Sequence, residues 1–211
     1  MRALRNLCGA VLLAGTAQAE PVVIAALGDS LTQGYGLVPE DGFVPQLERW
    51  LVAQGAEARV LNAGVSGDTT QGGLSRVDWT LTPEVDAMIV ALGGNDLLRG
   101  IDPAVSRANL AGILQAADGA EVEVMLVGLT APGNYGPDFK RDFDAMYPEL
   151  AAEFGALHVA SFLGPLSERA EEAGAVQRYM QADGIHPNAE GVALIVEGLG
   201  PAVLELIARV E

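Results

Sequence analysis

Several residue types that often carry protein chemistry are scarce in this sequence of 211 residues. It has one cysteine, two histidines, one lysine and only 5% aromatic residues. A lone cysteine cannot form a disulfide within the chain. Zinc sites draw three or four ligands from Cys, His and carboxylates at recognisable spacings; no such spacing occurs here, nor does an EF-hand pattern. A site of oxygen ligands alone, for calcium or magnesium, is the one metal alternative left open.

Positive charge is scarce as well. The chain has 12 Lys and Arg residues against 28 Asp and Glu residues, which gives a formal net charge of -16. Nucleic-acid-binding proteins need basic groups to neutralise phosphates, so this class is excluded. An anionic membrane surface attracts basic segments and is excluded on the same ground. Half of the residues are apolar, which is the composition of a folded domain with one core.

The first 19 residues have the pattern of a secretory signal peptide. Arg2 and Arg5 form a basic start, and the apolar run "LCGAVLLAGTAQA" ends in the small residues of an A-x-A cleavage site. The run is too short to cross a bilayer. We expect cleavage after Ala19, which removes Cys8 and leaves 10 basic against 28 acidic residues, a net charge of -18. Residues 20–211 would then form one domain, periplasmic or secreted.

Short apolar runs alternate with longer amphipathic stretches along this domain. The runs are continuous, as in strands covered on both faces, and they predict strands at 22–27, 58–63, 87–92, 123–129 and 156–161. Helical spacing predicts helices at 43–54, 69–81, 103–117, 139–154 and 188–210. We expect the last helix to weaken near 198–201, and its Glu197 and Glu205 argue against a membrane span. The alternation predicts a three-layer α/β domain with a parallel sheet.

The loops after the strands carry the functional signal, because ligands of such sheets bind beyond the carboxyl ends of the strands. The loops after the first four predicted strands contain "GDSLTQGYG", "NAGVSGDTT", "GGNDLLRG" and "TAPGNYG". Turns favour the Gly, Asp, Asn and Ser residues of these loops. Four such loops at one edge nevertheless exceed what turns require, and they indicate a site.

A phosphate site is one interpretation of the first loop, since a Gly-rich turn before a helix can bind phosphate through backbone N–H groups. The loop has neither the Walker pattern nor the third glycine of the dinucleotide fingerprint. Lys140 is the only lysine of the chain, and Asp29 would repel an anion. We therefore disfavour phosphate.

A nucleophilic serine is the other interpretation of this loop. Ser30 follows the first strand, and a serine nucleophile needs a base and a group that orients the base. His186 lies in the polar loop "ADGIHPNAEG" before the last helix, and Asp183 precedes it by three residues. Asp183 can hold the Nδ1–H of the imidazole so that Nε2 faces Ser30. Taken alone, this second loop could equally be a helix-capping turn.

Other residues compete for these roles or complete them. Ser66 lies in "GVSGD", which misses the last glycine of the G-x-S-x-G elbow, and we interpret it as a loop residue. We interpret His158, which lies in an apolar strand, as a hydrogen-bonded core residue. Acyl transfer also needs donors for an oxyanion. The candidates are the backbone N–H groups of Gly67 and Ser30 and the side-chain amide of Asn95.

Four segments of the chain together resemble a known family. In order, "GDSLTQGYG", "NAGVSGDT", "GGND" and "DGIHP" resemble the four sequence blocks of the SGNH (GDSL) hydrolases. Their defining residues correspond here to Ser30, Gly67, Asn95 and His186. The resemblance covers the expected mature chain nearly end to end. "GNYG" and "YPELA" are also similar to the family's bacterial periplasmic type with acyl-CoA thioesterase, protease and lysophospholipase activity, and to secreted arylesterases.

The resemblance implies a flavodoxin-like sheet of five parallel strands in the order 2-1-3-4-5, and a shallow site with no cofactor. It implies that Ser30 is the nucleophile and that His186 is first the general base and then the general acid. Asp183 would orient His186.

The resemblance also implies the roles of the residues around the nucleophile. The oxyanion hole would consist of the N–H groups of Ser30 and Gly67 and the side chain of Asn95. Asp29 would be structural and brace its loop. The segment after "GGND" would form a wall for the acyl chain, although packing of a helix start is an equal alternative for it. The apolar residues of this wall are Leu97, Leu98 and Ile101.

The expected function is hydrolysis of carboxylic ester and thioester bonds of short- to medium-chain acyl or aryl esters, through an acyl-serine intermediate. Alternatives with the same fold are a lysophospholipase and a carbohydrate O-deacetylase, for which Tyr35, Trp79 and Tyr135 could contact a sugar. A flavodoxin-like binding protein without turnover is the alternative from another class. We expect a small-molecule ester or thioester as partner, no nucleic acid, no stable membrane anchor, and a monomer or weak dimer.

Overall fold

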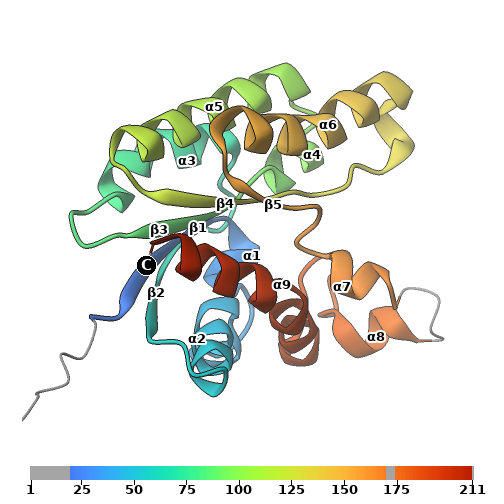
Figure 1. Cartoon of the computed structure of the whole chain (residues 1–211). Coiled ribbons are helices and arrows are strands. Elements are labelled where there is room, and N and C mark those ends of the chain that lie inside the picture. The colour runs from blue at the N-terminus through green and yellow to red at the C-terminus, as the bar shows by residue number, and fades with distance from the viewer. Residues whose placement is uncertain (1–19, 170–173, 211) are drawn as a thin grey trace, which may run out of the picture.

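A computed structural model of the chain, which describes residues 20–169 and 174–210, has three layers (Figure 1). The strands of its sheet are β1 (Val22–Gly28), β2 (Ala58–Gly64), β3 (Ala87–Ala91), β4 (Glu123–Val127) and β5 (Leu157–Val159). All are parallel, in the order β2-β1-β3-β4-β5. This confirms the predicted α/β class and the strand order that the family resemblance implies. The predicted signal peptide, residues 1–19, lies outside the described residues.

The long helices cover both faces of the sheet (Figure 1). One face carries α3 (Thr70–Thr80), α5 (Pro103–Gly119) and α6 (Pro137–Phe154), and the other carries α2 (Phe43–Ala53) and α9 (Ala189–Val210). Each begins and ends within two residues of its prediction. Local chemistry sets several of these ends: Thr69 and Asp102 cap the starts of α3 and α5 with their side chains, and Gly155, at φ +69°, ends α6.

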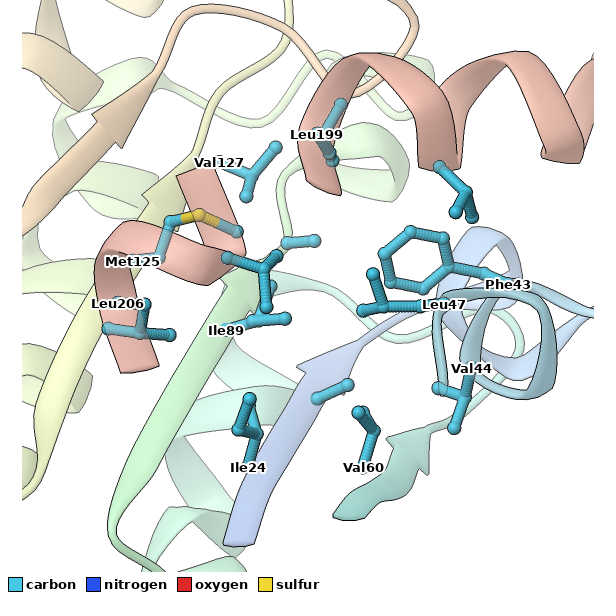
Figure 2. Packing of buried hydrophobic residues seen from close by; sticks show 14 of the residues in the cluster. Ile24, Phe43, Val44, Leu47, Val60, Ile89, Met125, Val127, Leu199 and Leu206 are labelled. Atoms are coloured by element: carbon cyan, nitrogen blue, oxygen red, sulfur yellow. The ribbon is translucent and has the colours of Figure 1, made fainter. Parts of the chain in front are cut away.

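The core lies in two apolar clusters, one on each face of the sheet. Figure 2 shows the cluster under α2 and α9, where Ile24 and Ile89 from the sheet meet Phe43, Leu47 and Leu199 from the helices. All five side chains are essentially buried, and each buried side chain of this size stabilises the fold by about 1.5–3 kcal/mol. The clusters hold the central strands, and therefore their carboxyl ends, in fixed positions.

The two outer strands differ from the prediction that every strand is covered on both faces. β1 and β3 are buried along their whole length, whereas β2 and β5 are partly exposed because they form the edges of the sheet. His158 lies on the edge strand β5 and is exposed. Its interpretation as a core residue was therefore wrong.

Helix α9 is long and apolar enough to cross a membrane, with a mean hydropathy of 1.8, but half of that stretch is buried within the domain. It packs on the sheet as a core helix. The helix runs without a break through residues 198–201, where a weakening was predicted, although Pro201 lies inside it and has no N–H for a helical hydrogen bond. Gly198 and Gly200 instead allow close packing: an added Cβ would lie 2.3 Å from Pro165 and 2.6 Å from Trp50.

Several short helices had no counterpart in the prediction, because a single turn shows no sequence period. These are α1 (Ser30–Gln33), α4 (Gly94–Leu98), α7 (Gly164–Ser167), α8 (Ala175–Tyr179) and the 3₁₀ turns η1 (Pro39–Asp41) and η2 (Gly133–Tyr135). Two of them follow directly on central strands: α1 begins just after β1, and α4 just after β3. These two turns carry Ser30 and Asn95.

Candidate active site

The predicted site residues meet at the carboxyl edge of the sheet. Ser30 follows β1, Gly67 lies in the loop after β2, and Asn95 follows β3. His186 and Asp183 come from the loop between α8 and α9, far away in the sequence. Ser30, Gly67, Asn95 and His186 line one cavity. The fold thus assembles residues that are up to 156 positions apart.

Ser30 is the first residue of α1, and the capping interaction of this short helix sets its position. Asp29 Oδ1 accepts a hydrogen bond from Leu31 N (3.0 Å), and the Asp29 side chain is buried. The residue before Asp29 must be a glycine, since a Cβ at Gly28 would lie 2.0 Å from Thr32 Oγ1. The strand therefore turns sharply into the helix and leaves Ser30 half-buried at the cavity.

His186 connects Ser30 to Asp183. Its Nε2 lies 2.9 Å from Ser30 Oγ, and its Nδ1 lies 2.6 Å from Asp183 Oδ2. The other oxygen, Oδ1, accepts from the backbone N–H groups of Ile185 (2.9 Å) and His186 (3.1 Å). The bond to the imidazole, followed by these two, lowers the pKa of Asp183 to about 2. An ionised carboxylate at Nδ1 keeps the ring proton there, which leaves Nε2 to accept from Ser30.

The structure also tests the alternative that the loop around His186 only caps the last helix. Asn188, rather than Asp183, caps α9: its Oδ1 accepts from Gly191 N at 3.0 Å, and its Nδ2 donates to Arg178 O at 2.7 Å. Capping and histidine orientation are therefore divided between two residues of the same loop.

Gln181 and Tyr35 hold the histidine loop against the serine loop, and no sequence pattern pointed to Gln181. Its backbone N–H donates to His186 O (2.8 Å), and its Nε2 donates to Pro187 O (3.0 Å) and Tyr35 O (2.8 Å). The Tyr35 ring lies 4.7 Å from the His186 ring, centroid to centroid. The sequence had suggested Tyr35 only as a possible sugar contact.

Asn95 and Gly67 lie beside Ser30 as candidate oxyanion donors. Asn95 Nδ2 donates one hydrogen to Asp68 O (2.9 Å), which fixes the amide plane, and its other acceptor is Asp29 Oδ2 at the long distance of 3.5 Å. Gly67 has a φ of +83°, a conformation that favours glycine, and its carbonyl accepts from Arg99 Nη2 at 2.8 Å. Both residues line the same cavity as Ser30.

The buried carboxyl group of Asp29 is the second perturbed acid of the site. Its Oδ2 lies 3.5 Å from Asn95 Nδ2, and Gly94 permits this approach, because a Cβ there would come within 3.0 Å of Oδ2. Burial raises the pKa of Asp29 to about 6, against the lowering effect of the Leu31 N–H. Asp29 therefore braces the loop as a capping residue, as the family resemblance implies, and it retains a proton in weak acid.

The cavity has a volume of about 380 Å³ and is mostly apolar. Leu97 and Leu98 line it as predicted, but Ile101 does not. The chain turns at Gly100 (φ +61°), and Ile101 N donates to Asp96 O at 3.0 Å, so Ile101 lies beyond the wall. The wall also has members that the sequence analysis had not assigned to it, one in α1 and the others in loops. These are Leu31, Leu129, Thr130, Leu163 and Ile185.

The remaining candidates take other positions. Ser66 lines the cavity, but its hydroxyl donates to Gln33 Oε1 (2.9 Å), an amide and not a base. Trp79 is 86% exposed on α3, and Tyr135 packs on Phe139 at a ring distance of 4.8 Å; neither lines the cavity.

Comparisons with known proteins agree with this geometry. Residues 26–194 match the model of the GDSL-like lipase/acylhydrolase family. The chain is 38% identical over 208 residues to Esterase TesA of Pseudomonas aeruginosa, covering 98% of this chain and 100% of that protein. It is 34% identical over 183 residues to Thioesterase 1/protease 1/lysophospholipase L1 of Escherichia coli, covering 86% and 83%. The crystal structure of AlinE4, an SGNH-hydrolase family esterase, superposes with a TM-score of 0.72 at 41% identity, covering 90% and 98%.

Proposed function

Because the chain belongs to the GDSL-like lipase/acylhydrolase family, we propose that it is a serine esterase for carboxylic esters and thioesters of short- to medium-chain acyl or aryl groups. The observation that carries the proposal is the hydrogen-bonded series from Ser30 Oγ through both ring nitrogens of His186 to Asp183. A base at this distance can take the serine proton and so make the oxygen a nucleophile. The apolar cavity beside Ser30 has the size of a small-molecule site.

In the acylation step, Ser30 gives its proton to His186 Nε2 while its oxygen attacks the carbonyl carbon. The carbonyl oxygen becomes an oxyanion, which accepts from the N–H groups of Ser30 and Gly67 and from the side-chain amide of Asn95, in place of its long contact with Asp29 Oδ2. The bond to the alcohol or thiol then breaks, and the imidazolium gives its proton to that leaving group. The products are an acyl-serine and a free alcohol or thiol.

In the deacylation step, a water molecule takes the position of the leaving group. His186 accepts a proton from this water, whose oxygen attacks the acyl carbon, and the same donors stabilise the oxyanion. The bond to Ser30 Oγ then breaks, the proton returns to the serine, and the carboxylic acid leaves. The ionised Asp183 stabilises the imidazolium in both steps, and the Nδ1 proton stays on the ring.

Turnover of p-nitrophenyl acetate and butyrate by single variants tests this function. We expect Ser30→Ala to lose several powers of ten in kcat/KM, as loss of a nucleophile does. Ser66→Ala is the matched variant, since Ser66 is the other serine hydroxyl of the cavity, and it should lose far less. A Ser30→Ala protein with wild-type kcat/KM would refute the assignment.

Two alternatives to the proposed substrate class have their own tests. A carbohydrate O-deacetylase is disfavoured because Tyr35 is the only one of the three suggested aromatic residues that lines the cavity; preference for acetylated sugar over aryl esters would reverse this choice. The relative from Escherichia coli is also a lysophospholipase by name. A series of p-nitrophenyl esters from acetate to palmitate reports the acyl length that the cavity accepts.

We also propose that the protein is exported, that it has no stable membrane anchor, and that it is a monomer or weak dimer. The basic start, short apolar run and A-x-A pattern of residues 1–19 support export. The packing of α9 on the sheet supports the absence of an anchor. N-terminal sequencing of the mature protein should begin at Glu20, and light scattering after size exclusion gives the oligomeric state.

A further inference from the structure

Arg76, on the inner side of α3, forms hydrogen bonds to three separate segments at the carboxyl edge of the sheet. Its Nε donates to Asp68 Oδ2 at 2.6 Å, its Nη1 to Ala63 O at 2.7 Å, and its Nη2 to Gly28 O at 2.9 Å. The side chains of Arg76 and Asp68 are only 22% and 17% exposed. One guanidinium thus bonds the end of β1, the end of β2 and the loop that follows β2.

Each of these segments leads to one of the proposed oxyanion donors. Gly28 O lies two residues before Ser30. Ala63 O and the Asp68 side chain flank the turn that contains Gly67, and this turn is closed by a bond from Asp68 N to Val65 O (3.1 Å). The third donor, Asn95, is held by the backbone carbonyl of the same Asp68 (2.9 Å).

The chemistry of this position requires an arginine. A guanidinium is planar and presents five N–H donors in a fixed arrangement, so it can bond three acceptors in different directions, whereas a lysine ammonium is a point charge on a flexible stem. The positive charge also offsets Asp68, whose negative charge would otherwise stand unpaired near Asp29. Hydrogen bonds between ionised partners in a largely desolvated place are short and strong.

We propose that Arg76 is a positioning residue that holds the three oxyanion donors in their relative places before substrate binds. It touches neither substrate nor reacting atoms. Its contribution belongs to the transition state, because preorganised donors stabilise the developing oxyanion more than the neutral ester. The proposal rests on the proposed esterase function.

Three variants test this role with p-nitrophenyl acetate. Arg76→Met removes all the donors but keeps an apolar stem, and Arg76→Lys keeps a charge. Arg59→Met is the matched control, since Arg59 pairs with Glu84 (3.0 Å) on the exposed edge of the sheet. We expect kcat of Arg76→Met to fall about 10²-fold, as for a misplaced donor, with KM changed less than about threefold. Arg76→Lys should lose less, and Arg59→Met should match the wild type.

Two further measurements distinguish positioning from general damage to the fold. A trifluoromethyl ketone forms a tetrahedral oxyanion on a serine nucleophile, so its affinity should fall by about the same factor as kcat. An amide analogue of the ester forms no oxyanion, and its affinity should stay at the wild-type value. Methylguanidinium should restore part of kcat in Arg76→Ala, and methylammonium should not.

Failure of this proposal and failure of the esterase function give different results. If a fluorophosphonate does not label Ser30 of the wild type, the function is wrong. If the wild type is labelled and turns over ester, a wild-type kcat in Arg76→Met, or equal losses of affinity for the ketone and the amide, overturns the positioning role. Should Arg76→Met fail to fold in a urea titration, Arg76→Lys and Asp68→Asn decide by the same ketone-to-amide comparison.

Discussion

Two aspartates of the site lie in opposite environments, and their environments fit different tasks. Asp183 is partly exposed and accepts three hydrogen bonds, which lower its pKa to about 2. It is therefore ionised at neutral pH, as a partner of an imidazolium must be. Asp29 is 3% exposed and is bonded mainly to one backbone N–H, so burial raises its pKa to about 6.

The raised pKa of Asp29 predicts a pH-dependent cost of folding. Its folded pKa of about 6 lies above the unfolded value of 3.8, so the folded state binds more protons between these two pH values and stability falls as pH rises through them. The shift corresponds to a loss of about 3 kcal/mol in the free energy of unfolding. This loss is present in full above about pH 6 and absent below about pH 4. Asn keeps the capping oxygen without the charge, so Asp29→Asn should lack this loss.

Urea titrations between pH 4 and pH 7 measure this effect. The free energy of unfolding of Asp29→Asn relative to the wild type should rise by up to about 3 kcal/mol across this range. Asp78→Asn, at an exposed position on α3, controls for the removal of one negative charge. A difference between Asp29→Asn and the wild type that stays constant with pH would show that folding does not raise the pKa of Asp29.

At the scale of the element, α4 is a single turn that cannot be stable alone, since helix nucleation is unfavourable at this length. Asp96 follows Asn95 directly in this turn and is fully buried. Asp96 accepts from Thr70 N (2.8 Å), Thr70 Oγ1 (2.6 Å) and Ser106 Oγ (2.9 Å). These bonds attach α4 to the starts of α3 and α5, and they fix the neighbouring Asn95 at the cavity.

Removal of this anchor should destabilise the whole domain. Asp96→Ala leaves three buried donors without their acceptor, and each such donor costs about 1–3 kcal/mol. We expect the free energy of unfolding to fall by about 3 kcal/mol or more, measured in urea at pH 7. Asp118→Ala, at the exposed end of α5, should change it by less than about 0.5 kcal/mol. A loss in Asp96→Ala as small as in this control would mean that α4 is held by its apolar contacts alone.

The long elements could be predicted because burial imposes a repeating pattern on many residues at once. The runs of β1 and β3 are apolar throughout, and that of β4 is apolar after Glu123, because helices cover them on both faces. The positions of the edge strands along the chain were predicted, but their exposure to solvent was not. The sequence of β5 does not show that no further strand lies beside it. His158 was misplaced for this reason.

The sequence predicted the residues of the site only where they lie in short motifs. Ser30, Asn95 and His186 lie in recognisable blocks, and the parallel sheet brings the ends of its strands together. Gln181 and Arg76 lie in no such block, because their roles consist of contacts with segments that are distant in sequence or pass through backbone carbonyls. Such contacts leave no pattern of residue types.

At the scale of the whole molecule, an apolar cavity opens on a strongly acidic protein. The chain carries a net charge of -16, and Asp29, Asp68, Asp96 and Asp183 all lie near the cavity. A field of one sign over a cleft repels molecules of the same sign and attracts the opposite one. This field acts on charged substrates and has little effect on neutral ones.

The acidic field therefore predicts discrimination against anionic esters that salt weakens. The Debye length falls from about 30 Å at 0.01 M to about 10 Å at 0.1 M ionic strength, so repulsion of a distant carboxylate should be strongest in dilute buffer. We expect kcat/KM for 4-acetoxybenzoate, relative to that for neutral phenyl acetate, to rise severalfold over this range of salt. The ratio of the two esters cancels any effect of salt on the fold itself. A ratio independent of salt would mean that the charges around the cavity are compensated locally, by groups such as Arg76 and Arg99, before they reach the substrate.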